Sequence, residues 1–287
     1  MKTGLGMNMY SRAEKRWGDE KYKKIKSFGF DAVDFDMINT DGEFYTCSEN
    51  ELINLCAREK SLASESGILI WQAHGPWRWP PRDFSAEDRA ERLDKMKKSI
   101  YISSLLGCKY WVVHPIMPFG IEEAGTENAQ KTWDMNLEFM SSLLETAKKY
   151  DVTICLENMP MLNFSMASPE KISEFVKTIG DDHFKICLDT GHVSVFERPK
   201  VGEAVRTLGS DIKVFHIHDN KFRMDLHMAP GLGIIDWHDF IKSLEDIGFD
   251  GVFSLETLPP EQYPNDLYEQ YCSLLYRVAE RMASNNY

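Results

Sequence analysis

The sequence has no segment that would place it in a membrane or in a disulfide-bonded scaffold. Among its 287 residues no apolar run approaches the ~20 residues of a membrane-spanning helix. The first residues lack the long apolar core of a secretory signal peptide. Its six cysteines include no close Cys-x-x-Cys pair, and Cys155 and Cys187 stand inside apolar runs, which favours buried free thiols. These absences predict a cytoplasmic protein without disulfides.

Basic side chains are in the minority. The chain has 33 Lys and Arg against 45 Asp and Glu, which gives a formal net charge of −12. This charge opposes the approach of DNA or of an anionic membrane, so the sequence argues against both as partners. A glycine-rich phosphate-binding fingerprint after the first expected strand is also missing, which argues against an open, doubly wound dinucleotide-binding sheet.

Short apolar runs alternate with amphipathic helical segments from end to end, in roughly eight units of about 30 residues. Alternating strands and helices imply a parallel sheet, and a closed (β/α)8 barrel typically needs about 250 residues. No linker or shift in composition marks a domain boundary. We therefore predict an α/β protein of one domain, residues 1–287, folded as a (β/α)8 TIM barrel. Helices are expected over 13–28, 49–66, 86–106, 127–150, 202–208 and 261–282, with Ser48, Ser168 and Asp236 as helix-opening caps, and long loops over 75–85, 159–167 and 220–235.

Six expected strands end in a residue that can bind a metal or act as a general base. The apolar run 185–188 is followed by Asp189, Gly191 and His192, and Gly191 is expected to allow a sharp exit from the strand. A buried carboxylate is unfavourable unless it is paired or bound to a metal. In a closed barrel these strand ends meet on one face, so we expect their side chains to converge. The other five strand ends carry His74, His114, Glu157, His216 and Glu256.

Four of these side chains, Glu157, Asp189, His216 and Glu256, offer three carboxylates and one imidazole. Such oxygen-rich sets suit Mn²⁺ or Mg²⁺, with Zn²⁺, Co²⁺ and Fe²⁺ as alternatives. The sequence therefore predicts a divalent metal as cofactor. Further candidates for substrate binding or for additional zinc are His74, His114, His192, Asp225 and His227.

Three other histidines are interpreted differently. His218 is two residues from His216 and so faces the same way on a strand, either as a wall residue or as a donor to a metal ligand. His183 and His238 stand at element edges and are interpreted as ordinary surface or packing residues.

The connection after His74 contains three prolines, which exclude a regular helix. Its Trp77, together with Lys221 and Arg223 in the loop after 219, is a candidate wall for a substrate, with the two basic residues placed to contact hydroxyls or a phosphate. The alternative is that the tryptophans of this loop simply pack on the rim of the barrel.

These residues resemble the xylose isomerase-like TIM barrels, the superfamily of sugar (phosphate) isomerases and epimerases and of apurinic/apyrimidinic (AP) endonucleases. The resemblance covers essentially the whole chain. It rests on His74-Gly75-Pro76, His114-Pro115, Leu156-Glu157-Asn158, Asp189-Thr190-Gly191-His192, His216-Ile217-His218-Asp219-Asn220, Asp225-Leu226-His227, Pro230-Gly231-Leu232-Gly233 and Leu255-Glu256-Thr257.

The resemblance implies two ligand arrangements. In the ketose epimerases, the residues that match Glu157, Asp189, His216 and Glu256 hold one divalent metal, and the two glutamates act as acid and base. In the endonucleases, nine matching residues hold three zinc ions. The sequence offers all nine, so both branches stay open at this point. The nine are His74, His114, Glu157, Asp189, His192, His216, Asp225, His227 and Glu256.

The favoured hypothesis is a metal-dependent isomerase or epimerase of a small sugar, sugar phosphate or related hydroxy-ketone. One glutamate would remove the proton next to the carbonyl and the other would return it, through a metal-stabilised enediolate. The alternatives are a zinc-dependent AP endonuclease-type phosphodiesterase, which the run Trp77-Arg78-Trp79 favours, a dehydratase of a polyol or dehydroshikimate-like acid, and a binding protein without turnover. The expected partner is a small carbohydrate, and relatives suggest assembly into a homo-oligomer through exposed helices.

Overall fold

Eight parallel strands form a closed barrel in the computed structural model, which describes residues 1–6 and 8–287 and, of these, all side chains but those of 8–11. The strands follow one another around the barrel, with the last beside the first: β1 (Lys2–Leu5), β2 (Ala32–Asp36), β3 (Leu69–His74), β4 (Tyr110–Val113), β5 (Thr153–Glu157), β6 (Phe184–Asp189), β7 (Ile212–His216) and β10 (Val252–Leu255). Ile217 closes the ring, because it bridges to Leu255 and its N–H donates to the carbonyl of Ser254 at 2.9 Å. The predicted (β/α)8 fold is confirmed.

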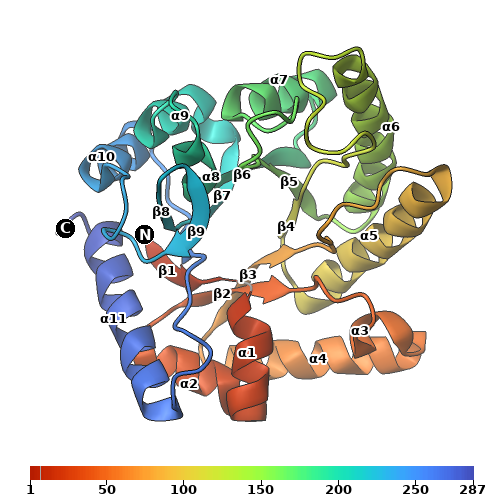
Figure 1. Cartoon of the computed structure of the whole chain (residues 1–287). Helices are drawn as coiled ribbons and strands as arrows, with labels where there is room; N and C mark the ends of the chain where they lie inside the picture. The colour runs from red at the N-terminus through yellow and green to blue at the C-terminus, as the bar shows by residue number, and fades with distance from the viewer. Residues whose placement is uncertain (7) are drawn as a thin grey trace.

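Helices surround the strands on the outside (Figure 1). The longer ones are α1 (Asn8–Trp17), α2 (Lys21–Phe28), α4 (Glu49–Glu65), α5 (Ala86–Leu106), α6 (Asn128–Lys149), α7 (Pro169–Ile179), α9 (Val201–Leu208), α10 (Trp237–Asp246) and α11 (Asn265–Ala283). Two short helices, α3 (Glu43–Thr46) and α8 (Thr190–Val195), follow β2 and β6. None of the helices in residues 1–6 and 8–287 is both long and apolar enough to cross a membrane.

Local capping chemistry sets the starts of three helices as predicted. The side chain of Ser48 accepts from the N–H of Glu51, which completes a capping box at α4. Ser168 caps α7, with Pro169 in its first turn. The carboxylate of Asp236 accepts from the N–H of Asp239 in the first turn of α10.

Two helical boundaries differ from the expectation. The helix expected over 13–28 is two helices, α1 and α2, separated by a 3-10 turn at Gly18–Glu20, where Gly18 has a φ of +50°. The last helix begins at Asn265 rather than near 261, because Pro264 disfavours helical backbone in the residue before it.

The segment 220–235, expected to be a loop, contains most of an antiparallel hairpin. Its strands are β8 (Asp219–Lys221) and β9 (Met224–Met228), and it lies in front of the barrel in the view of Figure 1. Phe222 and Arg223 form the turn with φ values of +56° and +57°. Such turns normally carry Asn or Gly, so the sequence lacked the usual hairpin signal.

A small apolar cluster fills the barrel beneath the strand ends. Val112, Cys155, Cys187 and Val214 are fully buried together, and each lies two residues before His114, Glu157, Asp189 or His216, on the same side of its strand. Cys155 and Cys187 are free thiols, as predicted. The polar strand ends therefore stand on an apolar floor.

Candidate metal centre and active site

Four side chains from neighbouring strand ends converge at one end of the barrel. Glu157 ends β5, Asp189 ends β6, His216 ends β7, and Glu256 follows β10. Each offers a ligand atom, and these four atoms all lie within 4.8 Å of one another. All four side chains are buried. The structure thus brings together the set that the sequence singled out.

The spacing within this set fits a bound cation. Nδ1 of His216 lies 2.9 Å from Oε1 of Glu157 and 3.4 Å from Oε2 of Glu256. Oε2 of Glu256 is buried and has no hydrogen-bond partner among the described residues. Three buried carboxylates would repel one another, and a divalent cation offsets that cost. We therefore find that these residues suit a divalent metal.

The two glutamates have different electrostatic surroundings. Burial opposes ionisation of Glu157, but His216 and His114 outweigh it and hold its pKa well below its usual range. Burial raises the pKa of Glu256, against the opposing effect of His216 and His227. Burial also acts to raise the pKa of Asp189, but His192 and His218 outweigh this effect and lower that pKa to about 2.

His74 and His114 stand beside Glu157 on the β3 and β4 side. Nε2 of His114 lies 3.0 Å and Nε2 of His74 lies 3.4 Å from Oε2 of Glu157. Nδ1 of His74 donates to the carbonyl of Gly75 at 2.8 Å, which leaves Nε2 free to face the glutamate. Burial lowers the pKa of His114 to about 4, so this ring is neutral and able to bind a metal.

Asn158 fixes the position of Asp189 and His192. Its side chain accepts from the N–H of Asp189 at 2.8 Å and donates to the carbonyl of Asp189 at 3.1 Å. Its own carbonyl accepts from Nδ1 of His192 at 2.7 Å. These bonds connect the ends of β5 and β6. They also orient the ring of His192 toward Asp225, so that Nε2 of His192 lies 3.4 Å from Oδ2 of Asp225.

Gly191 has a different role from the one expected. The residue does not turn the chain out of β6 with a positive φ; it lies in α8, whose N-cap is Asp189. A Cβ on Gly191 would lie 1.9 Å from Cε1 of His218. Glycine is required here because the ring of His218 packs directly against the backbone.

His183 and His238 lie apart from the converging residues. His183 contacts the carboxylate of Asp151 at 3.3 Å, and His238 is exposed and packs near Tyr287.

Asp34 was missed by the sequence reasoning. It lies in the middle of β2 and is fully buried, and its Oδ2 accepts from Nε2 of His216 and from Nε2 of Gln72, both at 2.9 Å. This bond places the proton of His216 on Nε2 and leaves Nδ1 to face Glu157 and Glu256. Only the position of this carboxylate between two apolar residues, Val33 and Phe35, could have drawn attention to it.

We expect Asp34→Asn to weaken metal binding, because the amide holds the imidazole less firmly and makes it less basic. Loss of such a partner typically lowers metal affinity by about 10–100-fold. Calorimetric titration with Mn²⁺ measures this change. Asp31→Asn is the matched control, since Asp31 precedes the same strand at the opposite end and pairs with Lys26. Equal affinity in both variants would contradict the role given to Asp34.

A cavity of about 380 Å³ opens above the converging side chains. Small-molecule sites range over about 300–1,000 Å³, so this one suits a small ligand. Trp77 and Arg223, two of the expected wall residues, line it, whereas Lys221 is not among the lining residues. Arg223 is the one Lys or Arg among the described lining residues, and it pairs with Glu197 at 3.2 Å. The wall is otherwise mainly apolar, with Trp79, Met159, Pro160, Met161 and Val195.

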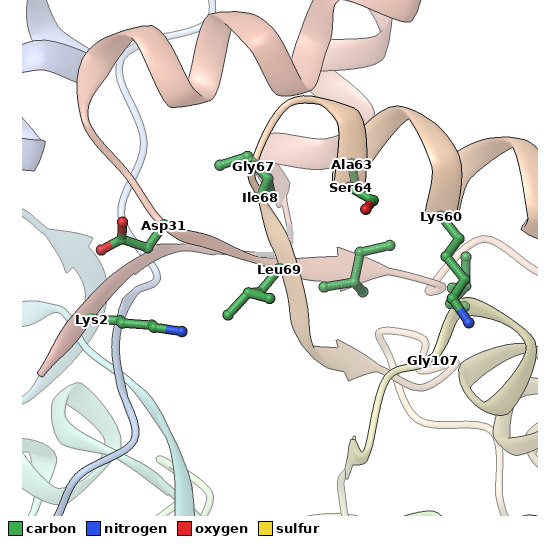
Figure 2. A pocket seen from close by; sticks show the side chains of 11 residues that line it. Lys2, Asp31, Lys60, Ala63, Ser64, Gly67, Ile68, Leu69 and Gly107 are labelled. Carbon is green, nitrogen blue, oxygen red and sulfur yellow. The ribbon is translucent and has the colours of Figure 1, made fainter.

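A second hollow of about 390 Å³ lies at the amino-terminal ends of the strands (Figure 2). Lys2, Asp31 and Lys60 are its charged lining residues, and Figure 2 shows Lys2 and Asp31 on one side and Lys60 on the other. Its described lining residues include no histidine, and the carboxylate of Asp31 already pairs with Lys26. Since TIM-barrel enzymes carry their chemistry at the carboxyl ends of the strands, the first cavity is the candidate active site.

Comparisons with known proteins agree with this architecture. Residues 22–277 match the sequence model of a family described as xylose isomerase-like TIM barrel. An uncharacterized protein of Methanocaldococcus jannaschii is 33% identical over 241 residues, which cover 82% of this chain and 77% of that protein. The D-psicose 3-epimerase of Ruminiclostridium cellulolyticum is 27% identical over 267 residues, covering 89% and 83%. A crystal structure of the IOLI protein with a binding zinc atom is similar in fold, with a TM-score of 0.78 at 18% identity over 100% of this chain and 99% of that one.

Proposed function

Because this chain belongs to the xylose isomerase-like TIM barrel family, we propose that it is a metal-dependent isomerase or epimerase of a small sugar or related hydroxy-ketone. The observation that carries the proposal is the pair of buried glutamates, Glu157 and Glu256, whose carboxylates lie 2.9 and 3.4 Å from the same nitrogen of His216. The similarity to a D-psicose 3-epimerase over most of both chains supports it.

Glu157, Asp189, His216 and Glu256 would hold the metal. A divalent cation bound there supplies positive charge that polarises a carbonyl and stabilises negative charge on its oxygen. The proton transfers are assigned to residues of the chain. Glu157 and Glu256 reach the substrate from β5 and from the end of β10, which are separated by β6 and β7 around the barrel. One carboxylate removes the proton next to the carbonyl and the other returns a proton from the opposite side.

The cavity wall favours a substrate without a phosphate. Recognition of a phosphate normally uses several positively charged side chains, but Arg223 is the one Lys or Arg in the described part of the lining, and it is already paired with Glu197. Trp77 and Trp79 provide apolar surface for the C–H face of a sugar ring or chain. A neutral monosaccharide-sized hydroxy-ketone fits these features best.

The AP endonuclease-type alternative has one observation in its favour. The histidines and carboxylates required for a three-zinc cluster lie in the same region, since Glu157 contacts His74 and His114 on one side, and Asp225 contacts His192 and His227 on the other. The net charge of −12 opposes it, because binding to a DNA backbone needs a basic surface.

Deuterium exchange tests the proposal directly. The protein is loaded in turn with Mn²⁺, Co²⁺, Mg²⁺ or Zn²⁺. It is then incubated in D₂O with a panel of free and phosphorylated ketoses and keto-inositols. Proton NMR follows the signal of the hydrogen on the carbon next to the carbonyl. We expect deuterium at that carbon together with epimer or isomer formation, and loss of both after the metal is removed with a chelator. The metal-free protein with metal restored is the control.

Other outcomes identify the alternatives. Loss of water from a cyclic substrate, seen as a new conjugated absorbance, would indicate a dehydratase. Cleavage of abasic DNA, without exchange on any sugar of the panel, would overturn the isomerase proposal in favour of a phosphodiesterase.

A further inference from the structure

A third hollow, of about 560 Å³, lies beside the candidate active site, between the β8–β9 hairpin and the loop after β10. Leu226 and His227 of β9 line it on one side, and Glu256 and residues 258–262 line it on the other. His227 and Glu256 also line the candidate active-site cavity. The two hollows therefore adjoin at a residue to which the proposed function gives a proton transfer.

The two hollows extend from Glu256 in different directions. The first cavity continues toward the segments after β3 and β4, where Trp77 and His114 line it. The third hollow continues toward Gly6, which follows β1, and toward Arg12 of α1. Strand β1 lies next to β10, whereas β3 and β4 lie farther around the barrel. A ligand whose reacting carbon lies beside Glu256 can therefore extend into both hollows.

Contacts from α1 hold the wall of the third hollow in place. Nη1 of Arg12 donates to the carbonyl of Pro259 at 3.1 Å, and Nη2 of Arg16 donates to the carbonyl of Tyr263 at 3.3 Å. Pro259 and Pro260 restrict the backbone further, because the proline ring fixes φ. The hollow is therefore formed before a ligand binds, which lowers the entropic cost of binding.

The lining of the third hollow combines hydrogen-bonding side chains with apolar surface. Arg12, Glu261 and Gln262 offer donors and acceptors, whereas Leu226 and Leu258 offer apolar surface. Small-molecule sites typically combine apolar walls with a few polar groups that fix orientation. A sugar ring has hydroxyl groups around its edge and C–H groups on its faces, so it matches a lining of this mixed kind.

The charges around the third hollow favour a neutral group over an anionic one. Arg12 is the one Lys or Arg among the described lining residues, and Glu256 and Glu261 line the same hollow. Recognition of a phosphate or a carboxylate relies on charge-assisted hydrogen bonds from cationic side chains. Because the carboxylates outnumber the guanidinium group here, the hollow suits an uncharged sugar better than a phosphate.

We infer that the substrate is a ketose that carries a second sugar unit, and that the third hollow binds this glycosyl group. The ketose unit reacts beside Glu256 in the first cavity, and the attached ring lies between the β8–β9 hairpin and the loop after β10. Binding energy from a remote part of a substrate can raise the rate at the reacting centre. This inference rests on the proposed function for the reaction itself, but binding of the second ring is measured without turnover.

Four isomers of glucosyl-fructose test the second subsite. Turanose, maltulose, leucrose and palatinose carry the same glucosyl group on different oxygens of fructose, so the group leaves the ketose in four directions. Calorimetric titration of the Mn²⁺-loaded protein gives the Kd of each isomer and of fructose. We expect at least one isomer to bind at least about 10-fold more tightly than fructose, because the second ring finds a preformed hollow.

Leu258→Trp distinguishes the third hollow from the first cavity. Leu258 lines the third hollow and is not among the described lining residues of the first cavity, so a tryptophan there fills space needed by the second ring. The ratio of the Kd of fructose to that of the tightest isomer should fall toward one. Leu267→Trp is the same change at an exposed position of α11 and should keep the wild-type ratio. Circular dichroism and elemental mass spectrometry verify folding and metal content, and Leu258→Phe replaces a Leu258→Trp variant that does not fold.

The outcomes separate this inference from the proposed function. Equal Kd values for fructose and all four isomers, or a preference for an isomer that persists in the Leu258→Trp variant, would overturn the inference. Proton exchange in D₂O, measured on the same samples, tests the reaction independently. Exchange with the tightest isomer would support both proposals. Tighter binding of an isomer without exchange on any sugar would retain the second subsite and overturn the proposed reaction.

Discussion

Replacing either Glu157 or Glu256 by glutamine is expected to lower the rate of epimerisation by about 10²–10⁴-fold or more. Glutamine keeps the volume and one carbonyl oxygen of the side chain but cannot take up or release the proton. Both residues are buried, and both contact Nδ1 of His216. The rate is measured by NMR on the best substrate of the panel.

Deuterium exchange separates loss of a base from loss of the metal. A variant that keeps its metal but lacks one of two bases should still exchange the proton of one epimer, without converting it to the other. Elemental mass spectrometry verifies that each variant remains loaded. Glu145→Gln, at an exposed position of α6, is the control with the same chemical change. Near-full epimerisation by a loaded Glu157→Gln or Glu256→Gln variant would disprove the acid–base assignment.

Asp219→Asn is expected to destabilise the protein by about 3–5 kcal/mol, because it removes a buried charge from its hydrogen-bond donors. Oδ1 of Asp219 accepts from the N–H groups of Asn220, Ile234 and Ile235 at 2.9 to 3.2 Å. Oδ2 accepts from the N–H groups of Gly231 and Gly233 and from Nε1 of Trp237 at 2.8 to 3.0 Å. If an amide NH₂ replaced one carboxylate oxygen, the N–H groups that donate to that oxygen would face another donor and lose their hydrogen bonds.

The destabilisation should appear as a fall of about 6–12 °C in Tm, with faster hydrogen exchange over 231–235. This segment follows the β8–β9 hairpin, so the positions of Asp225 and His227 should loosen with it. Asp182→Asn is the control, because that carboxylate is fully exposed and forms only a 3.5 Å ion pair with Lys185. If the Asp219→Asn variant had the same Tm as the Asp182→Asn control, and the amides of 231–235 stayed protected from hydrogen exchange, the anchoring role of Asp219 would be wrong.

The sequence predicted best what local patterns decide. The alternation of apolar runs and helical segments was sufficient for the barrel, and a charge at the end of an apolar strand identified Glu157, Asp189 and Glu256. Caps such as Ser48 were readable because their partners lie only three residues away. The residue-level roles of the site remain predictions, and the structure adds to them by showing that the expected side chains converge.

Long-range contacts decided the remainder. Asp34 looks like any polar residue of a strand until the barrel brings it to His216, 182 residues further along the chain. Apart from its neighbour Asn220, Asp219 finds its donors 12 to 18 residues later, in the loop after β9 and in the first residue of α10.

By itself, then, the amino-acid sequence determined the barrel, the face on which its polar residues gather and the chemical types of the candidate ligands, because each depends on the periodicity of strands and helices. Only the tertiary structure decided which of these side chains lie together, with Glu157, Asp189, His216 and Glu256 in one group and His192, Asp225 and His227 in another that also includes His218. That division depends on distances of 3 to 4 Å between residues of different elements, such as the 3.7 Å from His218 to Asp225, and no pattern along a single element can encode them.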